Sequence, residues 1–290
     1  MEIRLGTVIQ SDNGYMTNLA DSITEKELIA IQTHIAEIHN FENTKRLLDI
    51  VFLNSKEFVS ISKDSLLDMI NNSLSVGGDK EEYYKQHLDF NRMFLNYLSS
   101  IRTFIDHNET SIKRKFGRNS IEAKELKKIM SNIYDKYFSY RFLYKLRNYS
   151  QHCGLPIEDI EVSATKQEDG TFKGEGKIEF SGKELLENYK KWGTVKSDLE
   201  KWTSFSVYPV MKEMETALNE LWISLINFYS TNIDNAINFI NEKAEHLRSN
   251  ESIVCVFTDL VNDENGRLKY FKTLQIPFDV IDLIKINNFN

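Results

Sequence analysis

One short segment near the middle of the chain combines residue types that can move protons beside a phosphate group. Arg147 and Asn148 are followed, after three residues, by His152, with Gly154 and Pro156 close behind. Arginine presents a rigid fork of donors that matches phosphate oxygens, and histidine exchanges its proton readily near neutral pH. The segment therefore carries residue types suited to acid–base chemistry at a phosphodiester.

Cleavage of RNA without a metal makes demands that this set of residues can meet. The 2′-hydroxyl of the substrate attacks the adjacent phosphate, so a base must remove its proton and an acid must protonate the leaving oxygen. A cation must also stabilise the charge that develops on the phosphoryl group. His152 could serve as acid or base, Arg147 could hold the phosphate or stabilise the transition state, and Asn148 could orient either partner.

The segment resembles the motif of the HEPN superfamily, in which arginine is followed by asparagine, aspartate or histidine and, three to five residues later, by histidine. Arg147, Asn148 and His152 match this motif, and the resemblance covers about residues 80–156. It implies a metal-independent endoribonuclease that needs no cofactor and whose site forms where two copies of the chain meet. It also implies a toxin or a phage-defence effector. Whether a protein antitoxin or activator is a partner stays open.

The helical position of the motif limits how its residues can meet. At about 100° per residue, Arg147 and His152 lie roughly 140° apart around an ideal helix, whereas Asn148 and His152 share one side. Within one chain the two would converge only if the last turn unwound before Gly154. A symmetric dimer could instead bring Arg147 of one copy towards His152 of the other. The alternative is structural, because a histidine near a helix C-terminus interacts favourably with the dipole.

A second arginine and histidine have the same spacing on the preceding helical segment. Arg102 and His107 are separated by four residues, but Thr103 stands where the HEPN motif prefers asparagine, aspartate or histidine. The pair is an altered second motif, an element that contacts the substrate, or a chance match. We favour the chance match.

The densest group of cations consists of Lys113, Arg114, Lys115 and Arg118, with Phe116 among them. Cations beside an aromatic ring can hold a phosphate backbone, so these four residues are candidates for RNA binding. The alternative is that they only complement the dipole at a helix C-terminus. The net charge of −7 requires any RNA site to be a local positive patch.

The composition is that of an ordinary globular protein, with 41% hydrophobic and 27% charged residues. Cys153 and Cys255 form neither a disulfide framework nor a metal-ligand cluster, and no zinc, P-loop or dinucleotide-binding fingerprint occurs. We therefore expect no metal and no cofactor. Free thiols favour a reducing compartment. Without a signal-like N-terminus or an apolar run of about 18 residues, we expect a cytoplasmic protein with no membrane span.

Periodicity predicts a mainly α-helical protein, with long antiparallel helices in a HEPN-like bundle and two small β-hairpins. Three prolines in the whole chain permit long helices, and Thr24 with Glu27 fits a capping box at a helix start. The helical patterns run from Thr24 onward, over 62–74 before Gly77 and Gly78, and over 81–116, 121–153, 181–191 and 210–248.

Strand patterns occur at the two ends of the chain and after Pro156. Residues 1–10 predict a short strand before a turn, and hairpins are predicted at 157–180 and 252–274. One helical body is simpler than two domains, so residues 1–290 are predicted to form a single domain. Within it, the HEPN-like core covers about 80–156, a β-hairpin insertion covers 157–180, and C-terminal helices and a hairpin cover 181–290.

A second class of function stays open, a helical scaffold or partner-binding protein whose motif-like residues are structural. Long apolar stripes suit helix-mediated association as well as they suit a core. In that case the basic cluster would be dispersed in the fold, and the motif arginine would be engaged in an intramolecular ion pair. The homodimer rests on the resemblance, because core and interface stripes look alike in a sequence.

Overall fold

The computed structural model describes residues 2–12, 14–73, 80–157, 159–170, 172–264 and 268–288. It is mainly α-helical, as expected, and each of the two predicted hairpins is part of a larger antiparallel sheet. Contacts between Cα atoms divide the chain into two compact units, Met1–Asn43 with Asn227–Asn290 (unit 1) and Thr44–Ile226 (unit 2). Helices α1 (Glu25–Ser73) and α7 (Val207–Ala244) each contribute residues to both units. The predicted subdivision at 80–156, 157–180 and 181–290 stays a prediction.

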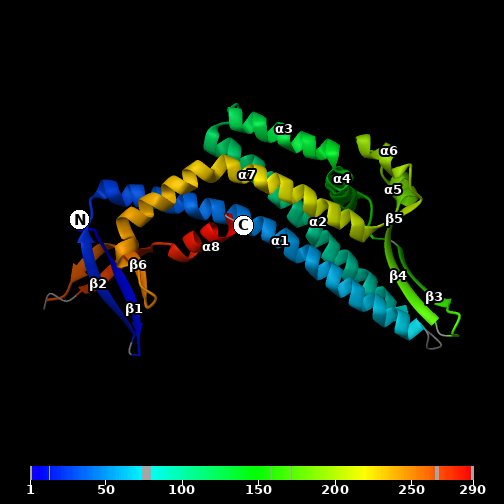
Figure 1. Ribbon diagram of the computed structural model, residues 1–290, viewed down its shortest axis with the longest axis horizontal. Coiled ribbons are helices and arrows are strands. Elements are labelled where there is room, and N and C mark those ends of the chain that lie inside the picture. Colours follow the sequence, from blue (N-terminus) through cyan, green and yellow to red (C-terminus); the bar gives the residue numbers. More distant parts are fainter. Residues whose placement is uncertain are drawn as a thin grey trace. The chain divides into compact units, whose positions relative to one another are not determined.

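Unit 1 contains a four-stranded antiparallel sheet in the order β2-β1-β6-β7, and Figure 1 labels its strands β1, β2 and β6. Its strands are β1 (Arg4–Ser11), β2 (Gly14–Ser22), β6 (Ser252–Asn262) and β7 (Leu268–Gln275). Buried Leu5 of β1 pairs with buried Val256 of β6, so the two ends of the chain share one sheet. The expected strand at 1–10 and the hairpin at 252–274 are confirmed. β2 and the final helix α8 (Phe278–Asn288) were not expected, and residues 265–267 of the predicted turn lie outside the described residues.

Thr24 and Glu27 form the capping box expected at the start of α1. The Thr24 backbone N–H donates to Glu27 Oε2 at 2.9 Å, and the Glu27 N–H donates to Thr24 Oγ1 at 3.2 Å. Lys243 donates to the other carboxylate oxygen at 3.1 Å. These bonds, the one from the Thr24 backbone foremost, lower the pKa of Glu27 to about 2.

α1 continues for 49 residues without a break. The separate, shorter helix predicted at 62–74 is therefore wrong, because these residues form the C-terminal part of one long helix. No proline or glycine lies between Glu25 and Ser73 to end it. Gly77 and Gly78, the predicted stop, lie outside the described residues.

Unit 2 contains α2 (Lys80–Phe116), α3 (Ile121–Lys136) and α4 (Phe138–His152). The long helix expected at 81–116 is confirmed, and Gly117 ends it with a φ of +103°, a conformation that glycine supplies at helix ends. The single helix expected at 121–153 is wrong. It is interrupted at Tyr137, whose backbone is extended with a φ of −110° and a ψ of 118°.

Two carboxylates of α7 account for the interruption at Tyr137. Glu213 accepts the Ser139 backbone N–H at 2.6 Å and so caps the start of α4. Glu220 accepts from Lys136 at 2.6 Å and from the Tyr137 hydroxyl at 2.8 Å. No glycine or proline marks the break in the sequence, so tertiary contacts decide it.

The remaining elements of unit 2 include a three-stranded sheet in the order β3-β4-β5. They are β3 (Asp159–Lys166), β4 (Phe172–Ser181), α5 (Gly182–Asn188), α6 (Lys196–Leu199) and β5 (Ser204–Ser206). The hairpin expected at 157–180 and the helices expected at 181–191 and 210–248 are confirmed as β3–β4, α5 and α7. Strand β5 and helix α6 were not expected.

Two glycines of β4 allow this strand to approach α1 closely. A Cβ atom on Gly176 would lie 2.9 Å from Cβ and Cδ2 of Leu66, and one on Gly174 would lie 1.9 Å from Cγ2 of Ile70. Both distances are shorter than any ordinary contact between carbon atoms. The glycines therefore serve packing between a strand and a helix.

Replacing Gly176 with valine is expected to lower the free energy of unfolding by about 2 kcal/mol, because its side chain must displace buried Leu66. Urea unfolding followed by tryptophan fluorescence measures this, since all three tryptophans lie in unit 2. Exposed Lys177 is the neighbouring residue of β4, so Lys177→Val is the matched control. Equal urea midpoints for the two variants would contradict the close approach.

Candidate functional site

Helix α4, which carries the motif, runs antiparallel to α2. The Arg102 guanidinium of α2 lies 4.0 Å from the ring centroid of Tyr144. Beyond the end of α4, Ile157 exchanges two backbone hydrogen bonds with the Asn91 side chain, at 2.8 and 3.0 Å. Residue 102 thus faces the middle of α4, and residue 91 faces the segment that follows its end. This is the antiparallel packing expected from the sequence.

The apolar side of α4 is fixed by an aromatic cluster. The Phe142 ring centroid lies 5.1 Å from that of Phe180 and 6.0 Å from that of Trp192. Tyr149 stacks on Trp192 at 6.0 Å, and the Trp192 indole N–H donates to the Leu185 carbonyl at 2.8 Å. This packing leaves α4 little freedom to rotate, so the motif residues are presented in a defined direction.

The motif occupies the last two turns of α4. Arg147 and Asn148 are half-buried and His152 is exposed. The helix stays regular to its end, because the Cys153 N–H donates to the Tyr149 carbonyl at 2.8 Å. Arg147 Nη1 donates to Gln151 Oε1 of the same helix at 2.6 Å. Within the part of the chain that the structure describes, the side chains of Asn148 and His152 have no hydrogen bond or ion pair.

Arg147 and His152 lie on opposite flanks of α4. Arg147 follows Tyr140 by about two turns and shares its flank. This flank faces α2, because burial raises the pKa of the Tyr140 hydroxyl and Arg102 of α2 acts to lower it. His152 follows Arg141 by about three turns, and Arg141 is bonded to Asp198 of α6 on the other flank. Because the last turn does not unwind, one chain alone does not bring the arginine and the histidine together.

Arg102 and His107 occupy different surroundings on α2. Arg102 Nε donates to Asp106 Oδ2 at 2.6 Å while its guanidinium covers the ring of Tyr144. His107 is exposed. Arg102 therefore connects α2 and α4, and the interpretation of this pair as a chance match to the motif spacing stays a prediction.

The cations at the end of α2 line a pocket of about 500 Å³, formed by Thr110, Lys113, Arg114 and Arg118. Lys113 is paired with Glu109 of the same helix. Arg114 and Arg118 are exposed, and neither has an ion pair or hydrogen bond among the residues described here. Lys115 is not a lining residue, and its ammonium lies 5.7 Å from the ring centroid of Phe116.

The structure does not bring this pocket and the motif together. Arg102 of α2 faces Tyr144, so His152, eight residues further along the antiparallel α4, lies at about the level of Phe94 on α2. Lys113 lies about five turns from Phe94 along α2, which corresponds to about 28 Å. An RNA molecule that contacts both regions would thus have to lie along the whole α2–α4 pair.

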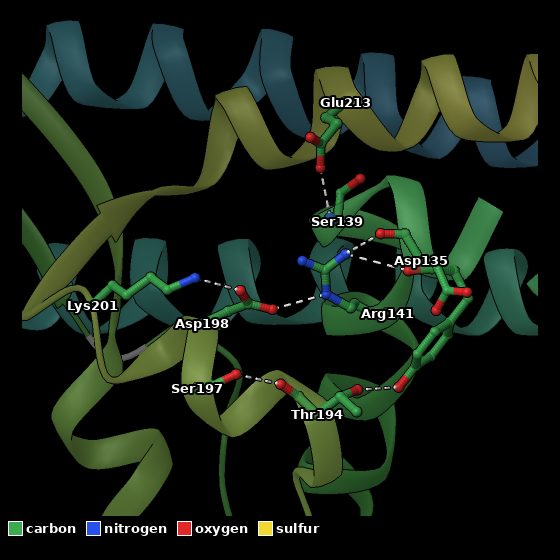
Figure 2. A network of polar contacts seen from close by, with 9 residues as sticks. Asp135, Ser139, Arg141, Thr194, Ser197, Asp198, Lys201 and Glu213 are labelled. Carbon is green, nitrogen blue, oxygen red and sulfur yellow. Dashed lines mark hydrogen bonds and ion pairs between the residues drawn. The ribbon is translucent and has the colours of Figure 1, made fainter. Parts of the chain in front are cut away.

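Figure 2 shows a polar network at the start of α4 that the sequence did not reveal. Arg141 Nε donates to Asp198 Oδ2 at 2.8 Å, and its Nη1 donates to the carbonyl oxygens of Tyr134 and Asp135, both at 3.3 Å. Lys201 donates to Asp198 Oδ1 at 3.0 Å. The network ties α4 to the end of α3 and to α6.

Asp198 is held ionised by this network. Its side chain is only 13% exposed, and that of Arg141 only 17%. Burial acts to raise the pKa of Asp198, but the hydrogen bonds from Arg141 and Lys201 outweigh it, and the pKa falls below its ordinary value of 3.8. No sequence signal marks this pair, because the two residues are far apart in the chain and form no motif.

A second pocket, of about 320 Å³, lies at the opposite end of α4 from His152. It is lined by Phe138, Trp202, Phe205, Ser206, Pro209, Val210 and Glu213. The three rings contact one another at centroid distances of 5.0 to 5.8 Å, and Glu213 is already used to cap α4. The lining thus belongs to the packing that supports α4.

The described residues contain no group of three or more histidine, cysteine, aspartate or glutamate side chains arranged to hold a metal ion. None of their helices is both long enough and apolar enough to cross a membrane. Cys153 and Cys255 are free thiols, the first exposed and the second buried. In comparisons with known proteins, no family model, no curated protein and no solved structure matches this chain.

Proposed function

We propose that this protein is a metal-independent endoribonuclease of HEPN type that acts as a homodimer. The observation that carries the proposal is the state of Asn148 and His152. The two side chains lie on one side of the last turns of α4. His152 is exposed and Asn148 is half-buried, and neither has a hydrogen bond or ion pair among the described residues. A histidine that the fold does not use, beside an amide and an arginine, is available for proton transfer.

Arg147 is also suited to this task. Its bond to Gln151 is made to a neutral, exposed amide, and a phosphate offers the same guanidinium two charge-assisted bonds. A phosphate would therefore displace Gln151 readily. Because Arg147 and His152 lie on opposite flanks, each complete site takes the arginine of one copy and the histidine of the other, around a two-fold axis.

We also propose roles for the helical bundle and for the cations at the end of α2, and a biological role for the enzyme. The α2–α4 pair, with α3 between them in the chain, would be the HEPN-like core. Lys113, Arg114 and Arg118 would hold a part of the RNA that lies away from the scissile bond. A role as a toxin or phage-defence effector in the cytoplasm, with an antitoxin or activating protein as partner, belongs to the same proposal.

The purified chain is expected to cleave mixed structured RNAs in the presence of EDTA and to leave 2′,3′-cyclic phosphate ends. These ends follow from attack by the 2′-hydroxyl, which needs no metal. End analysis of the fragments measures this, and single-stranded DNA of the same sequences is the control that must stay intact. Cleavage that EDTA abolishes, or the absence of cleavage by a folded dimer, would count against the proposal.

A helical scaffold or partner-binding protein is the second candidate, and the divergence of Arg147 and His152 within one chain favours it. The ion pair of Arg147 expected of a scaffold is not found among the described residues, because this arginine bonds to neutral Gln151. Apolar side chains are also exposed in unit 2, among them Leu53 of α1 at 65% and Ile223 of α7 at 62%, and a partner helix could bury such side chains. A scaffold would leave RNA intact in the experiment above.

A further inference from the structure

The pocket at the end of α2 holds two guanidinium groups that have no charge partner among the described residues. Arg114 and Arg118 line it together with Thr110 and Lys113. Only Lys113 has an acidic partner, Glu109, among the described residues. Like charges that share one hollow repel each other, and an anion between them would remove this repulsion. The protein as a whole carries a charge of −7, so this local excess of cations is unlike its average surface.

The position of the pocket differs from what a helix dipole alone would favour. Cations that only complement the dipole lie over the last carbonyl groups of a helix. Thr110, however, lies one turn before Arg114, so the pocket opens along the flank of α2. Gly117, with its φ of +103°, turns the chain so that Arg118 returns to the hollow that Arg114 lines. Two elements thus converge on one space.

We propose that this pocket binds phosphate esters. Guanidinium groups match phosphate oxygens with paired, charge-assisted hydrogen bonds, and the Thr110 hydroxyl can donate another. A volume of about 500 Å³ exceeds the needs of a single phosphate and suits a nucleotide unit. Such a ligand is supplied either by an RNA backbone or by a free nucleotide.

If the phosphate belongs to an RNA backbone, this inference rests on the proposed function and further defines its substrate. The pocket and the end of α4 are separated by about 28 Å along α2. An RNA duplex is A-form and rises less per base pair than B-form DNA, so a duplex of about ten base pairs is the shortest that reaches both. The enzyme is therefore expected to prefer RNAs of at least that length over shorter ones.

The test compares two variants that lose the same charge. Arg114→Gln with Arg118→Gln empties the pocket of its unpaired cations, and Lys127→Gln with Lys128→Gln removes two exposed cations of α3 as the matched control. Binding of a labelled, 2′-O-methylated RNA, which cannot be cleaved, is followed by fluorescence anisotropy over a series of salt concentrations. All four positions are exposed, so neither variant should unfold the chain.

The pocket variant is expected to bind this RNA about tenfold more weakly at low salt, and the control should bind as the wild type does. The slope of log K against log salt should fall by about 1.8, since each lost phosphate contact with a duplex contributes about 0.9. If instead ATP binds the wild type and the control but not the pocket variant, with RNA binding equal in all three, the phosphate comes from a free nucleotide. Equal binding of RNA and of ATP by all three proteins would overturn the proposal.

The outcome can be separated from that of the proposed function, because the labelled RNA reports binding without cleavage. If RNA binding depends on Arg114 and Arg118 but the protein does not cleave RNA, the phosphate-binding pocket is supported and the endoribonuclease is refuted. If the protein cleaves RNA but binding does not depend on these arginines, the endoribonuclease is supported and the pocket is refuted.

Discussion

Replacing His152 with alanine is expected to lower the rate of RNA cleavage by about three orders of magnitude. A positioned acid or base contributes roughly 10²- to 10⁴-fold, and no other histidine lies in the motif. His152 is exposed and has no bond among the described residues, so the urea midpoint should not change. Initial rates in EDTA measure the loss. His107→Ala removes another exposed histidine and should keep the rate within about twofold of the wild type.

Mixing two inactive variants tests whether the site is shared between copies. Arg147→Ala and His152→Ala chains are each expected to be inactive alone. After exchange of subunits, about half of the dimers are mixed, and each of these has one complete site out of two. The mixture should therefore recover about a quarter of the wild-type rate.

This recovery depends on the opposite flanks that Arg147 and His152 occupy on a regular helix. A site completed within one chain would show no recovery, because every chain would lack one residue. If the wild type is active but the mixture recovers no activity, the site shared between two copies is refuted, and the assignment of endoribonuclease activity stands. A His152→Ala variant that cleaves at the wild-type rate would refute the assignment of the catalytic histidine.

Local signals in the sequence predicted the elements whose boundaries are decided by nearby residues. Thr24 and Glu27 satisfy each other's backbone donors at the start of α1, within one turn of helix. Gly117 ends α2 because it can adopt a positive φ. Both effects act over a few residues, so they are visible in the sequence.

Elements that depend on distant residues were missed for a physical reason. The break at Tyr137 is stabilised by Glu213 and Glu220 of α7, and nothing around Tyr137 itself disfavours a helix. Likewise, β1 pairs with β6 from the other end of the chain. Hydrogen bonds and packing between segments far apart decide these features, and they override local propensity.

For the candidate site, the sequence supplied residue types, whereas the fold supplied their positions. The kinds of side chain at Arg147, Asn148 and His152 could be read directly. Their divergence depends on a last turn that stays helical, which the Cys153 hydrogen bond shows. The distance of about 28 Å between His152 and Lys113 follows from the register of α4 on α2, and only packing between the helices sets that register.

Replacing Arg141 with methionine is expected to lower the free energy of unfolding by about 3 kcal/mol at neutral pH. Methionine keeps much of the apolar length of arginine but leaves the carboxylate of Asp198 largely buried without its guanidinium. Removing one partner of such a pair is costly because the other charge stays out of water. Urea unfolding followed by tryptophan fluorescence measures the loss in unit 2, which holds all three tryptophans.

The size of this effect should depend on pH, and its sign follows from Asp198. In the wild type the folded-state pKa of Asp198 lies below 3.8. Ionised Asp198 therefore stabilises the fold above that pH, and this contribution is lost as the pH falls through the folded-state value. In Arg141→Met, burial still raises the pKa while the bond from Arg141 is gone. The carboxyl is then protonated more easily in the folded protein, so the destabilisation should shrink between pH 7 and about pH 4.

Lys201 provides the control for this experiment, because it bonds to the same carboxylate from an exposed position. Its side chain is 62% exposed, and exposed ion pairs contribute about 0 to 1 kcal/mol. Lys201→Met should thus cost far less than Arg141→Met. If the two variants unfolded at the same urea concentration, or if the loss in Arg141→Met did not change with pH, burial of Asp198 would not be the source of the effect. The start of α4, and with it the direction in which the motif is presented, would then depend chiefly on Glu213 and on the aromatic cluster around Phe142.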